Sequence, residues 1–249
     1  TPFDLSGQTA IVTGANTGIG QAIALSLAAA GADIAAVGRT PAQETVEKVR
    51  ALGRQAQIVS ADLSSIEPVQ RVVDETLEKL GRLDILVNNA GIIRRADSVD
   101  FTEEDWDAVI DTNLKTTFFL CQAAGRHMLA QGAGKIINIA SLLSFQGGIR
   151  VPSYTASKSG VAGLTKLLAN EWAARGVNVN AIAPGYIATN NTAALQADET
   201  RNRQIQERIP AGRWGDPGDI GGAAVFLASS AAAYIHGHTL AVDGGWLAR

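Results

Sequence analysis

The sequence is poor in residues that cross-link a chain or bind metals. Cys121 is the only cysteine among 249 residues, so no disulfide can form within the chain. The three histidines, His127, His236 and His238, lie without cysteines or carboxylates at metal-ligand spacing, and no metal site is expected. Lysine and arginine total 21 against 24 acidic residues. This slightly acidic balance argues against a polyanion-binding surface, and therefore against nucleic acid as a partner.

Long apolar runs are also missing. The longest charge-free stretch of interest, residues 221–237, is mostly Ala, Gly and Ser and is too short to span a bilayer comfortably, so no membrane association is expected. The first residues, TPFDLSGQTA, show neither the basic nor the apolar segment of a secretory signal. Together with the single cysteine, which is expected to be a small buried residue in FFLCQAAG, these absences favour a cytoplasmic location.

What the chain does contain is an alternation of short apolar runs with longer helical patterns. The apolar runs barely alternate with polar residues, which is typical of parallel strands covered on both faces. Strands are expected at Thr9–Thr13, Asp33–Val37, Ala56–Ser60, Asp84–Asn88, Lys135–Ala140, Val177–Ala183 and Thr239–Val242. Helices are expected at Gly18–Ala30, Thr40–Leu52, Ser64–Leu80, Glu103–Ala130 and Ser153–Arg175. The pattern predicts one α/β domain over residues 1–249, a Rossmann-type doubly wound parallel sheet of about seven strands with helices on both faces.

Two of these helices carry start signals. Thr40 precedes Pro41, which predicts an N-cap followed by proline at the first helical position. Thr102 precedes three acidic residues, which favour the positive end of a helix dipole. In doubly wound sheets, ligands bind beyond the carboxyl ends of the strands, so functional residues are expected there.

A glycine-rich turn, TGANTGIG, follows the first expected strand and leads into a helix. Glycines at 14, 18 and 20 allow a tight turn and a close approach to a pyrophosphate at the helix N-terminus. The spacing G-x-x-x-G-x-G differs from the commoner fingerprint G-x-G-x-x-G, and such a stretch can also be only a turn. Its place after the first strand favours dinucleotide binding.

The end of the second strand indicates which dinucleotide. An acid at this point would accept hydrogen bonds from the adenosine ribose, whereas this chain has Gly38 followed by Arg39. A guanidinium suits a 2′-phosphate, which favours NADP(H) and leaves NAD(H) possible. Arg39 can alternatively stack on the adenine or point to solvent. Asp62 and Leu63, after the third strand, are candidates for contact with the adenine.

The catalytic candidates come from the second half of the chain. Ser141 ends the fifth strand, and Tyr154 and Lys158 lie four residues apart on one face of the following helix. An adjacent ammonium is expected to lower the phenol pKa from about 10, so that Tyr154 can act as acid or base. Ser141 can hydrogen-bond the substrate oxygen. The alternative is a solvated Tyr–Lys pair on a helix surface.

Over essentially the whole chain, these features resemble the short-chain dehydrogenase/reductase family. The matching residues are Thr13, Gly14, Gly18, Ile19, Gly20, NNAG (88–91), Asn113, Ser141, Tyr154, Lys158 and PGYIAT (184–189). The resemblance implies that Asn113 helps to hold a water for proton relay and that Lys158 binds the nicotinamide ribose. It also implies homotetramers formed through the long helices that carry Asn113 and Tyr154 and through C-terminal segments. The stretches VFLASSAAAYIHG and GGWLAR, rich in small and apolar residues, fit such an interface. The expected cofactor-binding residues are Gly14, Asn16, Thr17, Gly18, Ile19, Gly20, Arg39, Asp62, Leu63, Asn89, Ala90, Gly91, Tyr154, Lys158, Pro184, Gly185, Ile187 and Thr189.

Within that family, several segments resemble dehydrogenases that interconvert a C5 alcohol and ketone on 2-dehydro-3-deoxy-D-gluconate. The segments include IIRRAD, SLLSFQGGIRVPSYTASKSG, NAIAPGYIATNNT and AVDGGWLAR. Such a sugar acid needs cations near its carboxylate, for which Arg94 and Arg150 are candidates, and Gln146, Tyr186 and Asn190 can hydrogen-bond its hydroxyls. The arginines can equally form ion pairs at the surface or at a subunit interface. Close relatives in this group are expected to use mainly NAD, from which Arg39 departs.

Other functions remain open from the sequence. A gluconate or polyol dehydrogenase and a 3-ketoacyl-thioester reductase would use the same scaffold and the same catalytic residues. A dinucleotide-binding regulator is the alternative from a different class. The complete set of Ser141, Tyr154 and Lys158 argues against a regulator, because such a protein needs no tuned phenol.

Overall fold

Seven parallel strands form one sheet in the order β3-β2-β1-β4-β5-β6-β7, which confirms the predicted architecture. The computed structural model describes residues 1–249. The strands are β1 (Thr9–Thr13), β2 (Asp33–Gly38), β3 (Ala56–Ser60), β4 (Ile85–Asn88), β5 (Gly134–Ile139), β6 (Val177–Pro184) and β7 (Thr239–Val242). Strand order reverses direction between β1 and β4, and this switch point is where an open α/β sheet binds its ligands.

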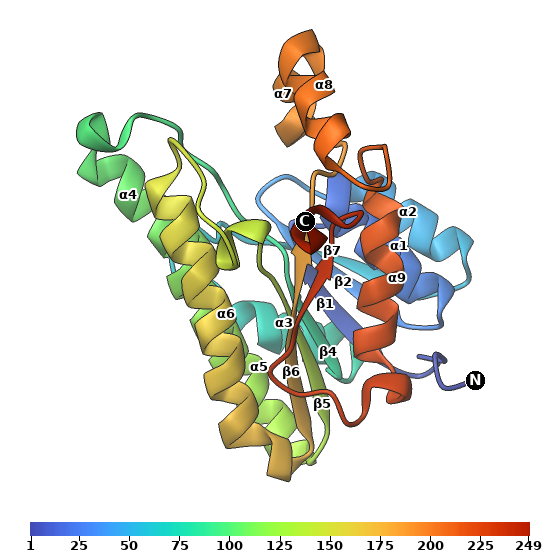
Figure 1. Cartoon of the computed structure of the whole chain (residues 1–249). Helices are drawn as coiled ribbons and strands as arrows, with labels where there is room; N and C mark the ends of the chain where they lie inside the picture. Colours follow the sequence, from blue (N-terminus) through green and yellow to red (C-terminus); the bar gives the residue numbers. More distant parts are fainter.

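Helices cover both faces of the sheet, as Figure 1 shows. One face is packed by α1 (Gly18–Ala29), α2 (Gln43–Ala51) and α9 (Pro217–Ala228), and the other by α3 (Val69–Leu80), α5 (Thr116–Gln131) and α6 (Pro152–Trp172). The pleat of β1 divides the core accordingly: Val12 belongs to the cluster under α1, and Ile11 to the cluster under α5. No helix of the chain combines the length and the apolar character that crossing a membrane requires.

The single cysteine is buried on α5, as expected. Asn88 Nδ2 donates to Cys121 Sγ at 3.2 Å and to Asn138 Oδ1 at 2.9 Å, so the thiol belongs to a small polar network inside the core. Burial raises the pKa of the Cys121 thiol to about 12. The group is therefore a protonated, unreactive thiol in the folded protein.

Helix boundaries differ from the prediction at two prolines. The helix predicted from Thr40 begins at Gln43, with the buried Ala42 as N-cap, so the prediction of Thr40 as cap and Pro41 as first residue was wrong. The helix predicted from residue 64 begins at Val69, after Pro68. A residue before proline disfavours helical backbone, which prevents this helix from starting earlier. Thr102 does cap α4 (Glu103–Ile110), and its hydroxyl accepts from the Asp105 N–H at 3.2 Å.

The helix predicted over Glu103–Ala130 is interrupted by one wide turn. Residues Asp111–Lys115 form a π-helical segment between α4 and α5. The Asn113 side chain is buried there, and the Thr117 hydroxyl donates to the Asn113 carbonyl at 2.9 Å. Such turns mark places where a helix places one residue out of register, often for function.

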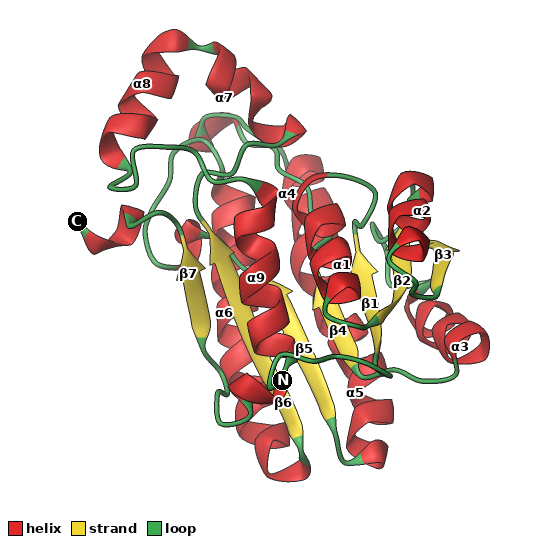
Figure 2. Cartoon of the chain, turned by 90° about the vertical axis from the view of Figure 1, so that its right-hand side faces the viewer, coloured by secondary structure: helices red, strands yellow, loops and turns green.

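An arm of two short helices stands above the carboxyl ends of the strands, as Figure 2 shows. It consists of α7 (Ala193–Ala197) and α8 (Glu199–Arg208), which the sequence analysis did not predict. The arm rests on a small apolar cluster of its own, separate from the two cores of the sheet. Its buried members are Leu142, Ile205, Ile209, Trp214 and Trp246.

Candidate active site

The glycine turn between β1 and α1 has the geometry of an anion-binding site. Gly14 and Gly18 have φ values of 65° and 56°, which only glycine adopts without strain. A Cβ on Gly20 would lie 2.1 Å from the Gly14 carbonyl oxygen, so this position requires glycine on steric grounds. No side chain caps the N-terminus of α1, and its first turn carries no acidic residue. Its N–H groups are thus free to face a pyrophosphate.

Hydrogen bonds hold the end of β4 against this turn. The Thr13 hydroxyl accepts from the backbone N–H groups of Asn89 and Ala90, each at 2.9 Å. The Asn89 amide returns a hydrogen bond to the Thr13 carbonyl at 3.0 Å. The segment NNAG therefore lies beside the glycine turn, where the backbone passes close to the expected dinucleotide.

A cleft of about 360 Å³ opens along the carboxyl ends of β1, β4, β5 and β6. It brings together most of the residues that the sequence predicted for a cofactor and for catalysis. Those that line it are Gly14, Asn16, Thr17, Gly18, Ile19, Gly20, Asn89, Ala90, Gly91, Ser141, Tyr154, Lys158, Pro184, Gly185, Ile187, Thr189 and Asn190. The other lining residues are Ile92, Ile93, Arg95, Ile139, Ala140, Asn191 and Thr192.

Ser141, Tyr154 and Lys158 meet on one side of this cleft. The loop after Ser141 is tied to α6, because the Ser144 hydroxyl donates to the Lys158 carbonyl at 2.7 Å. The Lys158 ammonium is buried; it donates to the Ile139 carbonyl at 2.6 Å and lies 5.6 Å from the centre of the Tyr154 ring. The Ser141 side chain is close enough to the Tyr154 phenol to lower its pKa. Tyr154, the expected proton donor, and Ser141, the expected contact of the substrate oxygen, therefore lie next to each other.

Burial controls the titration of this pair. It raises the pKa of the Tyr154 phenol, and the neighbouring Ser141 side chain and the Arg95 charge oppose that rise only in part. Burial likewise lowers the pKa of Lys158 to about 8. The expectation that a neighbouring lysine lowers the phenol pKa was therefore wrong for this state of the protein. The physical reason is that the cleft disfavours both charged forms more than the lysine favours the phenolate.

The arrangement of glycine turn, serine, tyrosine and lysine along one sheet edge agrees with comparisons against known proteins. The family model described as enoyl-(acyl carrier protein) reductase matches residues 14–247, almost the whole chain. The chain belongs to the short-chain dehydrogenase/reductase family. It is therefore an NAD(P)-dependent oxidoreductase.

Several relatives of this dehydrogenase/reductase carry the names of enzymes that act on sugar acids. The 2-dehydro-3-deoxy-D-gluconate 5-dehydrogenase of Escherichia coli (strain K12) is 59% identical over 248 residues, which are 99% of this chain and 98% of that protein. A crystal structure from Agrobacterium tumefaciens with bound NADP, provisionally named a 2-deoxy-D-gluconate 3-dehydrogenase, is 61% identical, with a TM-score of 0.93 and all of both chains covered. A gluconate 5-dehydrogenase from Burkholderia cenocepacia J2315, solved with NADP and tartrate, is 40% identical, with a TM-score of 0.94 and 100% and 98% coverage.

Asn113 of this dehydrogenase/reductase lies behind the cleft and does not line it. Its carboxamide accepts from the Ile92 N–H at 2.8 Å and donates to the Ile92 carbonyl at 2.9 Å. It also donates to the Ser157 hydroxyl at 3.3 Å, and Ser157 donates to the Tyr154 carbonyl at 2.8 Å. The side chain thus couples the loop after β4 to the helix of Tyr154.

Three residues predicted for the adenosine end lie outside the cleft lining. Arg39, Asp62 and Leu63 follow the ends of β2 and β3, the neighbouring strands on the far side of β1. Hydrogen bonds from Ser64 lower the pKa of the Asp62 carboxyl, and the charge of Arg39 lowers it further. Leu63 is buried. Arg39 and Asp62 are therefore within electrostatic reach of each other at the place where the adenosine of a dinucleotide would lie.

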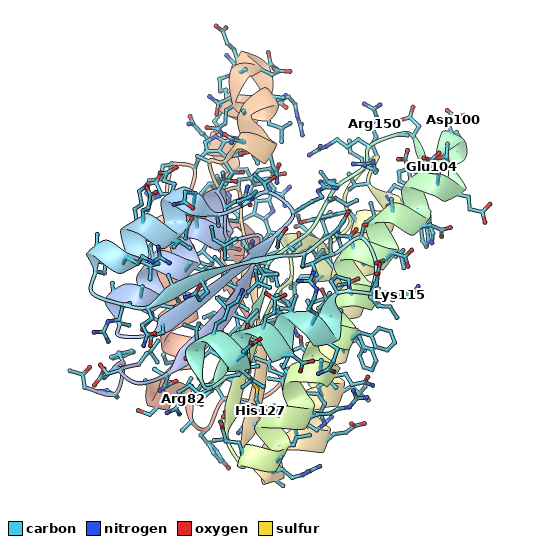
Figure 3. The ribbon with its side chains drawn as sticks, turned by 180° about the vertical axis from the view of Figure 1, so that it is seen from behind. Arg82, Asp100, Glu104, Lys115, His127 and Arg150 are labelled. Atoms are coloured by element: carbon cyan, nitrogen blue, oxygen red, sulfur yellow. The ribbon has the colours of Figure 1, made fainter.

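Four of the predicted substrate residues do not line the cleft. Arg94 Nε pairs with Asp105 Oδ1 at 3.1 Å, and Arg150 Nε pairs with Asp97 Oδ1 at 3.0 Å, so both form the surface ion pairs of the alternative reading. Figure 3 shows Arg150 at the outer end of the molecule, near Asp100. The other two contact the last turn of the chain: Gln146 accepts from Trp246 Nε1 at 3.3 Å, and Tyr186 packs on Trp246 at 4.7 Å between ring centres.

Arg95 is the cation that the sequence analysis did not select. Its side chain lines the cleft and is close enough to Tyr154 for its charge to lower the phenol pKa. It takes part in none of the ion pairs of the structure, in contrast to Arg94 and Arg150. The two arginines are neighbours in IIRRAD, and a loop without periodicity gives no signal as to which of them faces inward.

Proposed function

We propose that this enzyme interconverts the C5 alcohol and ketone of 2-dehydro-3-deoxy-D-gluconate with NADP(H). The observation that carries the proposal is the cleft in which Ser141, Tyr154 and Lys158 share one wall with the unpaired cation Arg95. The first three serve any secondary alcohol or ketone, and the fourth suits an anionic substrate. The name of the relative from Escherichia coli, 59% identical, supports the same substrate.

Protein groups perform the proton chemistry of this reaction. When bound, the nicotinamide supplies or accepts the hydride. Tyr154 donates its phenolic proton to the ketone oxygen in reduction and accepts the alcohol proton in oxidation. The Ser141 hydroxyl donates a hydrogen bond to the same substrate oxygen and stabilises negative charge that develops on it. Lys158 is assigned to the nicotinamide ribose, and Asn113 to holding the relay water beside it.

The cofactor assignment rests on the ends of two strands. Gly14, Gly18 and Gly20 leave room and free N–H groups for the pyrophosphate, and Arg39 replaces the acid that would select NAD. Related structures that are 61% and 40% identical were solved with NADP. Arg39→Asp should therefore raise the KM for NADP about tenfold or more and lower that for NAD. An unchanged preference between the two cofactors would remove Arg39 from the site.

Arg95 is assigned to the substrate carboxylate. C5 and the carboxyl carbon lie four bonds apart, so one cation beside the phenol can contact the carboxylate while C5 faces Tyr154. Arg95→Ala should raise the KM for the keto acid about tenfold or more, and the matched variant Arg94→Ala should change it little. Loss of the cation also raises the phenol pKa, so the acidic limb of alcohol oxidation should move to higher pH. Equal effects of the two substitutions would contradict this assignment.

A substrate panel separates the proposal from its alternatives. Purified enzyme is assayed with 2-dehydro-3-deoxy-D-gluconate, gluconate, neutral polyols and a 3-ketoacyl thioester, each with NADP and NAD. The proposal requires the highest kcat/KM for the keto acid with NADP. The highest value for the thioester would make the chain a ketoacyl reductase, and no turnover of any compound would favour the dinucleotide-binding regulator.

Several further expectations stay predictions. They are a homotetramer formed through the helices of Asn113 and Tyr154, one domain over residues 1–249, a cytoplasmic location, and hydroxyl contacts from Asn190. Asn190 lines the cleft, which supports the last of these. The half-exposed apolar residue Leu167 on α6 supports the first.

A further inference from the structure

The last turn of the chain, Asp243–Ala248, packs against the arm and is held in a fixed shape. We refer to it as the Trp246 turn. The Asp243 carboxylate accepts from the N–H groups of Gly245 and Leu247 at 2.8 and 2.9 Å. The Ala211 N–H donates to the Gly244 carbonyl at 2.9 Å, which ties the turn to the chain that leaves α8. The turn is therefore an ordered part of the structure around the cleft.

One indole ring in this turn contacts two segments that contribute residues to the cleft, and also the end of α8. Trp246 packs on Tyr186, whose neighbours Gly185 and Ile187 line the cleft. The guanidinium carbon of Arg208, the last residue of α8, lies 4.0 Å from the centre of the indole. Trp246 Nε1 donates to Gln146 Oε1 on the loop that begins at Ser141. Trp246 itself does not line the cleft.

The contact with Gln146 completes the anchoring of the Ser141 loop. The near part of the loop is tied to α6, through Ser144 and through the Ser159 hydroxyl, which donates to the Leu143 carbonyl at 3.2 Å. Gln146 is the last residue before the exposed Gly147 and Gly148. Without the indole contact, the far part of the loop would have no side-chain partner before this flexible pair.

We infer that Trp246 is a positioning residue, which holds the Ser141 loop and the end of α8 in one fixed relation at the substrate side of the cleft. Since Ser141 must lie within hydrogen-bond distance of the reacting oxygen, a loosened loop lowers the rate of the chemical step. The pyrophosphate end of the dinucleotide site, Gly14–Gly20, belongs to the turn between β1 and α1 and takes part in none of the hydrogen bonds of the Trp246 turn. The inference rests on the proposed function only in that Ser141 acts on substrate.

A double-mutant cycle tests the link between Trp246 and Gln146. Trp246→Phe keeps a ring on Tyr186 and removes the N–H donor, and Gln146→Met keeps the length and removes the acceptor. Each should lower kcat/KM about fivefold, with cofactor Kd unchanged, and the double variant should lose no more than either single one. Trp214→Phe is the matched control, because its N–H donates within the arm, to Asn202 at 2.7 Å. In the double variant Trp214→Phe/Gln146→Met, the fold-losses in kcat/KM of the two single substitutions should multiply.

Hydrogen exchange provides a second readout that needs no substrate. Amides of residues 142–148 should exchange faster in Trp246→Phe and in Gln146→Met than in the wild type and in Trp214→Phe. The inference would be overturned if the losses in kcat/KM of Trp246→Phe and Gln146→Met multiplied in the double variant. It would also be overturned if amide exchange in residues 142–148 were unchanged. The kinetic arm uses whichever substrate the wild type turns over best, so failure of the keto acid would refute the proposed function and leave this test intact.

Discussion

At the scale of single residues, Lys158 shows how burial controls the chemistry of the cleft. Its side chain is 5% exposed, no carboxylate pairs with it, and its pKa falls from 10.5 to about 8. Between these two pH values, the unfolded chain retains a proton that the folded protein has lost. The free energy of unfolding therefore rises with pH in this window. Below it, both states are charged and the cost of the buried ammonium is constant.

This sign can be checked by denaturant unfolding of the cofactor-free protein. Relative to Lys158→Met, which has no proton to lose at this position, the wild type should gain stability between about pH 8 and about pH 9.5. The buried Cys121 thiol, whose pKa is raised, opposes this gain equally in both proteins. Lys166→Met, on the exposed face of the same helix, should behave like the wild type. Tyr154, whose pKa is raised from 10.0, stays protonated in both states over most of the window. Equal slopes in the wild type and Lys158→Met would contradict the account.

Single residues also show what the sequence could and could not predict. The spacing of Tyr154 and Lys158 placed both on one helix face, and both line the cleft. Their pKa directions depend on burial, which spacing does not reveal. Arg94 and Arg95 differ only in the direction that each takes from an irregular loop, so the sequence analysis selected the one that pairs with Asp105.

At the scale of elements, the turn before α1 combines backbone geometry with binding. Gly20→Ala would place a methyl group 2.1 Å from the Gly14 carbonyl oxygen, so the turn must open and lose its anion site. Cofactor affinity should fall at least about a hundredfold, as measured by fluorescence of the reduced nicotinamide. Gly222→Ala is the control, because nothing lies within 4 Å of its added methyl on α9. It should leave affinity unchanged and stabilise the helix by about 0.5–1 kcal/mol. Tight cofactor binding by Gly20→Ala would refute the assignment of this turn.

Start signals gave one correct helix start and one that lay too early, at Thr40, and elements without apolar periodicity were missed. The cap at Thr102 was read from acidic residues that follow it, and it is confirmed. The π-helical turn at Asp111–Lys115 inserts no glycine or proline, so the helical pattern runs through it unchanged. α8 is almost wholly polar, with Ile205 its only buried residue, and gave no apolar face to detect.

At the scale of the whole molecule, the sheet was predictable because its strands are apolar and their connections follow one handed rule. The proposed tetramer follows only from the family resemblance, since no apolar surface patch can be assigned before folding. Leu167→Glu on α6 places a charge on the expected interface and should lower the mass measured by light scattering from that of a tetramer. Leu52→Glu is a matched control, since Leu52 is 49% exposed and Leu167 48%, and Leu52 lies beyond α2. A wild type of monomer mass, or equal effects of the two, would contradict the tetramer.

The oxidation of 2-dehydro-3-deoxy-D-gluconate with NADP, followed by absorbance of the reduced nicotinamide, tests the central claim most directly. The wild type should turn over, and Tyr154→Phe should lose about a thousandfold in kcat while its Kd for NADP is unchanged, because only the proton acceptor is removed. Tyr234→Phe, at a fully exposed tyrosine, should match the wild type. An inactive wild type, or a Tyr154→Phe variant that retains its rate, would contradict the account.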